Sequence, residues 1–264
     1  MAVDSLLNPL AGFLVGLLVG FTGVGGGALM TPLLVLLFGV APQTAVGTDL
    51  LFAAVTKAFG AWVHGTRGSI DWVVLRRLAA GSVPAAALTL VALHYLPGQK
   101  EAAALLLPAL GIALALTSVA MLFQSSLHRL GQRLRTNAPE RFKHAQPGLT
   151  VVAGAVLGFL VTLTSVGAGA LGVVMLVYLY PYRLTPAKLV GTDIAHAIPL
   201  TLVAGLGHWH LGNVDFGLLR TLLIGSIPGI IVGSRLSGGV NPVYVRRAIA
   251  ITLATVGAKI LLQR

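Results

Sequence analysis

The stretch Val46-Gly47-Thr48-Asp49-Leu50 recurs as Val190-Gly191-Thr192-Asp193-Ile194, 144 residues further along the chain. The same offset matches Pro42 with Pro186 and Gly81-Ser82 with Gly225-Ser226, while an offset of 142 matches Val24-Gly25 with Val166-Gly167. Chance does not place so many glycines, prolines and polar residues in register. The sequence therefore predicts two homologous repeats, and this duplication organises the expected fold.

The composition excludes a soluble globular enzyme, a disordered chain and a disulfide-bonded secreted domain. Hydrophobic residues make up 56% of the 264 residues, charged residues only 9%, the mean hydropathy is +0.91 and there is no cysteine. A soluble domain carries about 25% charged residues. Apolar stretches of about 20 residues, the length that spans a bilayer, recur along the chain. We therefore expect an all-α polytopic membrane protein, and no signal peptide, since Met1 to Leu7 has no basic region.

Both repeats are expected to share one plan: a helical segment broken by glycines, followed by three transmembrane helices. The breaks are Gly23-Val24-Gly25-Gly26-Gly27 and Gly167-Ala168-Gly169. The expected divisions are residues 1–124 for the first repeat, 125–146 for a basic, solvated linker and 147–264 for the second repeat. The linker carries five cations against the single Glu140, namely Arg129, Arg133, Arg135, Arg141 and Lys143.

The formal net charge of +11 reports orientation rather than a nucleic-acid partner. If each broken segment forms a hairpin, three net crossings remain per repeat, and 13 cations fall on the side of the linker against 4 on the other. This bias predicts a cytoplasmic linker and repeats of inverted topology. If each broken segment crosses fully instead, the bias becomes smaller.

Paired breaks at equivalent positions are typical of transporter binding sites, because unwound backbone at membrane depth must face protein or a water-filled cavity. Backbone N–H groups there attract anions. We expect substrate contacts from the break and its flanks, with close helix packing or helix back-bonding as the alternative. The candidates are Thr22, Gly23, Gly25, Gly26, Gly27, Thr164, Ser165, Gly167 and Gly169. For the regularly spaced Gly12, Gly16, Gly20, Gly154 and Gly158, close helix packing is favoured.

Lys57 lies inside an otherwise apolar stretch, Leu50 to Val63. An ammonium is costly at membrane depth unless it is paired or reaches water. We expect it to attract a substrate anion or to pair with Asp49 or Asp193, with snorkelling as the competing explanation. The second repeat has Thr201 at the equivalent position, so this cation is not duplicated.

The remaining polar candidates occur mostly as repeat-matched pairs. Thr48-Asp49 and Thr192-Asp193 are expected to open helices, where they either cap the helix or carry a coupling proton. Asp71 and Asp215 are expected to be N-caps. His64, His208 and the unpaired His196 are candidates for gating or proton transfer, with helix-end hydrogen bonds as the alternative for the matched pair.

Several motifs together resemble the TauE/SafE sulfite exporter family. They are Gly23-Val-Gly-Gly-Gly27 followed by Pro32, Ala45-Val-Gly-Thr48, the His64–Asp71 segment and Gly81-Ser-Val-Pro84, and the pattern recurs in the second half. The resemblance implies a secondary transporter in the bacterial or archaeal inner membrane that moves sulfite, sulfoacetate or related sulfonates.

The leading hypothesis is an alternating-access anion transporter coupled to protons, and the resemblance implies that its substrates are small sulfur-containing anions. A passive anion channel is the alternative, and a membrane-embedded lipid-modifying enzyme is disfavoured because clustered acid–histidine motifs are absent. There is no Walker motif. No His/Asp group stands at metal-ligand spacing, so we expect no metal and no cofactor. Which anion moves, and whether the chain forms oligomers, stays open.

Overall fold

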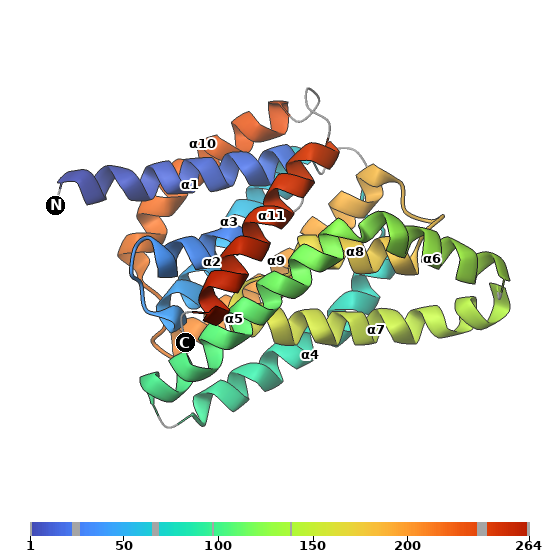
Figure 1. Ribbon diagram of the computed structural model, residues 1–264, viewed down its shortest axis with the longest axis horizontal. Helices are drawn as coiled ribbons and strands as arrows, with labels where there is room; N and C mark the ends of the chain where they lie inside the picture. The colour runs from blue at the N-terminus through green and yellow to red at the C-terminus, as the bar shows by residue number, and fades with distance from the viewer. Residues whose placement is uncertain are drawn as a thin grey trace.

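The computed structural model describes residues 2–22, 27–64, 69–96, 98–137, 139–236 and 242–262. Within these ranges every regular element is an α-helix, as expected. The helices are α1 (Ala2–Thr22), α2 (Gly27–Leu36), α3 (Pro42–His64), α4 (Trp72–His94), α5 (Gln99–Leu122), α6 (Gln124–Asn137), α7 (Pro139–Thr164), α8 (Ala170–Leu179), α9 (Pro186–His210), α10 (Phe216–Leu236) and α11 (Pro242–Leu262) (Figure 1).

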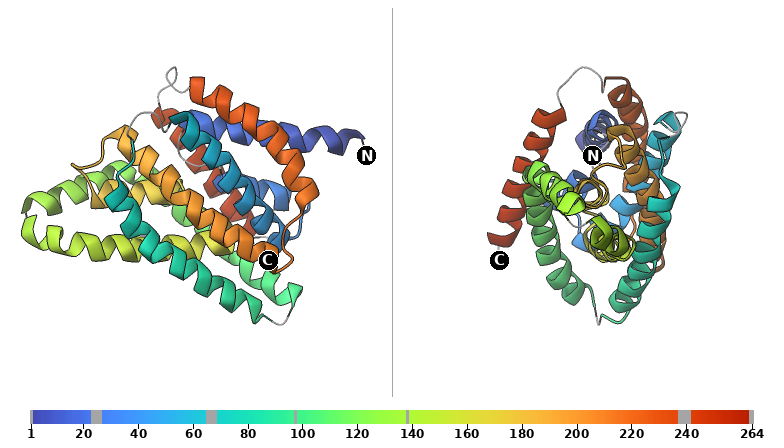
Figure 2. Two further views of the ribbon diagram at one scale, coloured as in Figure 1. Left: turned by 180° about the vertical axis from the view of Figure 1, so that it is seen from behind. Right: turned by 90° about the vertical axis from the view of Figure 1, so that its right-hand side faces the viewer.

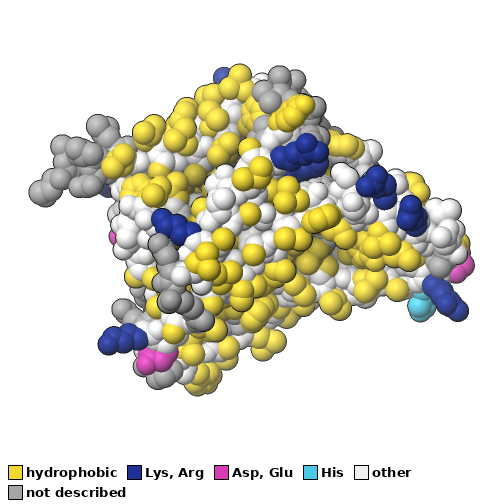
Figure 3. Space-filling view, in the orientation of Figure 1, with side chains coloured by type: hydrophobic (Ala, Val, Ile, Leu, Met, Phe, Trp, Pro, Cys, Tyr) yellow, Lys and Arg dark blue, Asp and Glu magenta, His cyan; other side chains and the backbone are white. Residues whose placement is uncertain are grey.

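The membrane prediction agrees with the helix lengths and with the outer surface. Among the described residues, five helical stretches are long and apolar enough to cross a membrane. They are Trp72–His94, Lys100–Leu122, Pro139–Thr164, Pro186–His210 and Phe216–Leu236. Large apolar side chains such as Leu88 and Val91 of α4 and Leu116 of α5 are exposed, and hydrophobic side chains cover much of the face in Figure 3. Such an apolar surface fits contact with lipid.

Four pairs of helices form the most extensive packing: α1 with α10, α4 with α7, α3 with α9 and α5 with α11 (Figures 1 and 2). The first two pairs are held by close glycine contacts. A Cβ on Gly16 of α1 would overlap the backbone of Ser226 in α10, and one on Gly158 of α7 would overlap the backbone of Ser82 in α4. The same holds for Gly12, Gly20 and Gly154, so the packing interpretation of these glycines is confirmed.

The close contacts also define helix directions. Along α1 and α10, Gly12 faces Leu222 and Gly20 faces Ile230, so these two helices are parallel. In contrast, α3 and α9 are antiparallel, because Gly47 lies against His208 while Leu51 lies against Gly205.

The helix starts correct one sequence prediction. Asp71 caps α4 by accepting from the amides of Val73 and Val74, and Asp215 accepts from the amide of Leu218 at the start of α10. Both N-cap predictions are confirmed. Thr48-Asp49 and Thr192-Asp193, however, do not open helices.

The reason is the pair of prolines upstream. Helices α3 and α9 begin at Pro42 and Pro186, so the two Thr-Asp pairs lie in the second turn of each helix. Proline favours the first helical position because its φ is already helical and its missing N–H would be unpaired there. Thr185 caps α9 instead, by accepting from the amide of Lys188.

Residues 125–146, expected to be a solvated linker, are almost wholly helical. They comprise most of α6 and the first two turns of α7, which form a hairpin at one end of the molecule (Figure 1). Gly131 lets α6 approach the backbone of Tyr178 in α8. Several Lys and Arg side chains lie in a row toward this end (Figure 3).

Candidate functional site

The second glycine break separates α7 from α8 and has an unusual backbone. Ser165 has φ 57°, Gly167 has φ 113° and Gly169 has φ 139°. A side chain is strained in this left-handed region, so glycine is required at the last two positions. Thr164 donates from its hydroxyl to the carbonyl of Leu160 at 2.6 Å and accepts from the amide of Val166 at 3.1 Å. Its hydroxyl is thus used by the backbone, as the back-bonding alternative predicted.

The first break falls outside the described residues. This applies to the predicted candidates Gly23, Gly25 and Gly26, and nothing is described of the side chains of Thr22 and His64. Gly27 is the first residue of α2.

Lys57 of α3 reaches the second break. Its side chain is only 3% exposed, and its ammonium donates to the carbonyl oxygen of Ala168, between the two positive-φ glycines. It therefore does not snorkel toward water. A lysine from the first half thus satisfies a backbone carbonyl in the irregular segment of the second half.

Two buried carboxylates act on the same ammonium. Asp193 of α9 and Asp49 of α3 both attract the buried Lys57 ammonium electrostatically. Asp49 also accepts from the amide of Thr31 at 3.1 Å and from its hydroxyl at 2.6 Å. Ser165 lies near the Asp49 carboxylate. We call Thr31, Asp49, Lys57, Ser165 and Asp193 the central polar cluster.

Several atoms of this cluster lack hydrogen bonds within the described part of the chain. They are Oδ1 of Asp49, Oδ2 of Asp193 and the hydroxyl of Ser165. Asp193 also packs tightly on α8, because a Cβ on Gly172 would overlap its other carboxylate oxygen. Buried polar atoms are usually paired, and exceptions point to a functional group or an absent ligand. The single positive charge of Lys57 can neutralise only one of two ionised carboxylates.

Further polar contacts join the helices next to the cluster. His196 of α9 shares a hydrogen bond with the hydroxyl of Ser82 in α4 at 2.8 Å, and Thr56 of α3 pairs with Ser226 of α10 at 3.1 Å. His208 shares a hydrogen bond with the carbonyl of Thr162 at 2.9 Å. The bond at His208 fits the alternative of a helix-end contact.

The two repeat-matched threonines make equivalent contacts. Thr192 accepts from the amide of Asp71 at 2.9 Å, and Thr48 accepts from the amide of Asp215 at 3.0 Å. Each therefore ties α9 or α3 to the N-cap of a helix in the other half of the chain.

Sequence reasoning missed several of these residues. Thr31 and Thr56 carried no signal, because single threonines in apolar helices commonly bond to their own backbone. Ser82 and Ser226 belong to the repeated Gly-Ser pairs, and this repetition could have identified them as candidates. Within the described residues no three His, Asp or Glu side chains are placed to hold a metal ion.

The family model for the sulfite exporter TauE/SafE matches residues 9–260, nearly the whole chain. The chain belongs to this family. It is 39% identical to the probable membrane transporter protein YjnA of Bacillus subtilis over 96% of this chain and 98% of that protein. It is 30% identical to the probable membrane transporter protein YdhB of the same organism, over 97% of this chain and all of that protein.

A more distant relative is the probable membrane transporter protein MJ0441 of Methanocaldococcus jannaschii, 26% identical over 97% of this chain and 96% of that protein. No solved structure matches the chain. Family and fold together make this TauE/SafE protein a multi-pass membrane transporter.

Proposed function

We propose that this protein is a proton-coupled secondary transporter of small sulfur-containing anions such as sulfite, sulfoacetate or another organosulfonate. The family description, sulfite exporter, supports the substrate class. The observation that carries the proposal is the buried ammonium of Lys57, which donates to the Ala168 carbonyl at the second glycine break and is attracted by Asp49 and Asp193. It is a cation at the point where the helix is interrupted, and such a charge favours the binding of an anion within a membrane.

Coupling follows from the charge balance of the central polar cluster. An incoming anion competes with the carboxylates for Lys57, and two ionised carboxylates beside it would repel the anion. Protonation of one carboxyl weakens that repulsion, and protonation of both leaves the ammonium to the substrate. Asp49 and Asp193 each have an oxygen without a hydrogen bond in the described structure, which leaves a position for such a proton. Anion and proton then bind together.

We further propose that residues 1–124 and 147–264 are inverted repeats that rock against each other to give alternating access. The reciprocal contacts support this arrangement. The packing of α1 on α10 is repeated by α7 on α4, with equivalent glycines against equivalent serines. The equivalent helices α3 and α9 are antiparallel, as an inversion requires. Some contacts between the two repeats would break when the binding site changes from facing one side of the membrane to facing the other.

The transport test is flux into proteoliposomes, measured for sulfite and sulfoacetate with and without an imposed proton gradient. We expect accumulation against the anion gradient only when protons flow. Lys57→Met, which keeps the length of the side chain and removes the charge, should lower flux at least about tenfold, the loss of one charge-assisted contact. Lys259→Met, at an exposed lysine of α11, is the matched control. Downhill flux without accumulation would establish a passive anion channel instead.

The orientation test uses the absence of cysteine from the chain. A single cysteine replaces the exposed Thr136 of α6 or the exposed Lys100 of α5. In right-side-out inner-membrane vesicles, an impermeant thiol reagent should label position 100 and spare position 136. The opposite pattern would place the basic segment 125–146 outside the cytoplasm.

A further inference from the structure

A cavity of about 480 Å³ opens at the end of the molecule that carries the α6–α7 hairpin. Four of its lining residues are cations that come from four different segments: Arg77 of α4, Arg135 of α6, Lys143 of α7 and Arg183 of the loop after α8. No Asp or Glu is among the described residues that line it. We call it the basal cavity.

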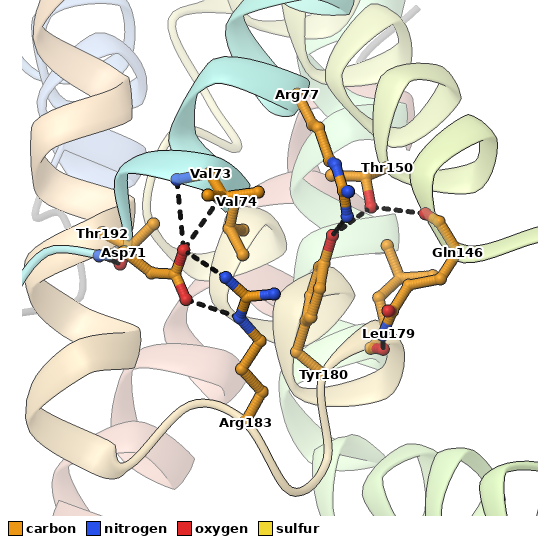
Figure 4. Close-up of polar contacts among 10 residues, drawn as sticks. All are labelled: Asp71, Val73, Val74, Arg77, Gln146, Thr150, Leu179, Tyr180, Arg183 and Thr192. Atoms are coloured by element: carbon orange, nitrogen blue, oxygen red, sulfur yellow. Dashed lines mark hydrogen bonds and ion pairs between the residues drawn. The ribbon is translucent and has the colours of Figure 1, made fainter. Parts of the chain in front are cut away.

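Two of the four cations already have partners. Arg183 donates to Asp71 through two nitrogens at 2.6 and 2.9 Å (Figure 4). Arg77 points toward the hydroxyl of Tyr180, 3.4 Å away, and that hydroxyl also pairs with Thr150 at 2.8 Å (Figure 4). These hydrogen bonds fix the positions of Arg77, Tyr180 and Arg183 in the lining of the basal cavity.

Arg135 differs from them. Its Nη1 is buried, yet it has no hydrogen-bond partner in the described structure. A buried donor of a charged group without an acceptor is costly, and a guanidinium is costlier than a neutral amide. The group that best satisfies it is an oxyanion, since the guanidinium fork matches two of its oxygens. Lys143, exposed on the neighbouring helix α7, adds a second positive charge to the cavity lining.

The size of the basal cavity indicates which oxyanion fits. Its volume lies in the range of sites that enclose drug-sized ligands, so a bare sulfite or sulfate would fill only a small part. A phosphate ester fills more of it, with the phosphate at Arg135 and its organic substituents against Tyr180 and Tyr182. Basic cavities at the cytoplasmic ends of membrane helices are suited to anionic lipid headgroups in the same way.

We propose that the basal cavity binds a phosphate ester, with Arg135 and Lys143 as its principal contacts. This site is separate from the central polar cluster, shares no residue with it and does not depend on the proposed transport function. The ester comes either from an anionic phospholipid or from a soluble metabolite, and the two sources share the same phosphate chemistry.

The experiment uses the full-length protein purified in detergent. Native mass spectrometry counts bound phosphatidylglycerol against phosphatidylcholine, and isothermal titration measures glycerol 3-phosphate against chloride. We expect retention of phosphatidylglycerol, or saturable binding of glycerol 3-phosphate, with no such binding of the two comparison ligands. The first result identifies a lipid ligand and the second a soluble one. The proposal would be overturned if phosphatidylcholine bound as well as phosphatidylglycerol and glycerol 3-phosphate bound no better than chloride.

Matched variants locate the ligand. Arg135→Gln should weaken binding about tenfold, the loss of one charge-assisted contact, while Arg133→Gln changes an exposed arginine of the same helix and should leave the affinity within about twofold. On α7, Lys143→Gln is the test variant and Arg141→Gln its control. This pair replaces the first if Arg135→Gln does not fold. Unchanged affinity in both Arg135→Gln and Lys143→Gln would contradict the proposal. Lys57→Met should bind normally, which separates this result from any failure of transport.

Discussion

The centres of α3 and α9 have equivalent scaffolds but different chemistry. Both helices begin with a proline, and both place a threonine against the N-cap amide of a helix in the other half. Yet α3 carries Lys57, where α9 has Thr201, whose hydroxyl donates to its own helix at Ala197. Asp49 is held by Thr31, whereas the offset of the repeat places Val173 at the corresponding position of α8.

This difference separates contacts that occur in both halves from contacts that occur in one. The glycine contacts and the threonine–N-cap contacts occur twice, as packing requires of both halves. The ammonium and the Thr31 contact occur in one half only. A transporter with two identical centres would have two equivalent sites, whereas an unequal pair of centres suits a single substrate. Four predictions test this comparison.

The largest effect is expected at the duplicated helix packing. Gly158→Ala should destabilise the protein by about 3 kcal/mol, because the new methyl group would overlap the carbonyl of Ser82 and force α4 and α7 apart. Gly148→Ala, in the same helix with nothing within 4 Å of an added Cβ, should be neutral or slightly stabilising. Thermal unfolding in detergent measures both. Equal melting temperatures would contradict the close-packing role.

The second prediction concerns the unequal carboxylates. Thr31→Val should cost about 2 kcal/mol, since it removes the hydroxyl donor of a buried Asp49 carboxylate. Val173→Thr places a hydroxyl at the equivalent position beside the second break and should cost less. Thermal unfolding compares the two, and proteoliposome flux shows whether the added hydroxyl changes transport. A greater loss for Val173→Thr would mean that the two centres are not related in this way.

The third prediction tests the duplicated threonine contacts. Thr48→Val and Thr192→Val each leave an N-cap amide without its acceptor, so each should cost about 1 kcal/mol. The informative quantity is their difference in melting temperature, which should be close to zero. A clear inequality would show that only one half depends on this contact.

The smallest effect is expected at the two N-caps. Asn keeps the capping acceptor in both Asp71→Asn and Asp215→Asn, but only Asp71 also pairs with Arg183, at 2.6 Å. Because the Arg183 side chain is 44% exposed, solvent screens the pair, and Asp71→Asn should cost only about 0.5–1 kcal/mol more than Asp215→Asn.

The pH dependence gives this prediction a second readout. Partial burial raises the pKa of Asp71, but hydrogen bonds from Arg183 and from the amides of Val74 and Val73 outweigh it and hold the pKa below its usual value. The folded state therefore binds this proton less readily than the unfolded state. The pair stabilises the fold above the unfolded pKa of about 4 and loses its effect as the pH falls through the lower folded value. Melting temperatures of wild type and Asp71→Asn should converge on acidification, and a constant gap would argue against the ion pair.

Local sequence signals were sufficient for much of the scaffold. The caps at Asp71 and Asp215 could be predicted because each side chain bonds to its own helix. The glycine packing of α1 and α7 could be predicted because a missing Cβ lets another helix approach the backbone. The predicted starts of α3 and α9 were wrong. The Thr-Asp pairs look like N-caps, and this local signal is stronger than that of the prolines six residues earlier, where the helices begin. The basic segment 125–146 was recognised by charge, which does not distinguish a loop from an exposed helix.

By itself, then, the sequence determined the membrane class, the repeated motifs, the position of the second glycine break and the isolation of Lys57 in an apolar stretch. Only the tertiary structure decided what these groups touch: Lys57 with Ala168 across 111 residues, Thr31 with Asp49, and His196 with Ser82 across 114 residues. The physical reason is that periodicity and composition carry information only about residues within a few helical turns or one membrane span. Which faces of distant helices meet depends on the packing of the whole bundle.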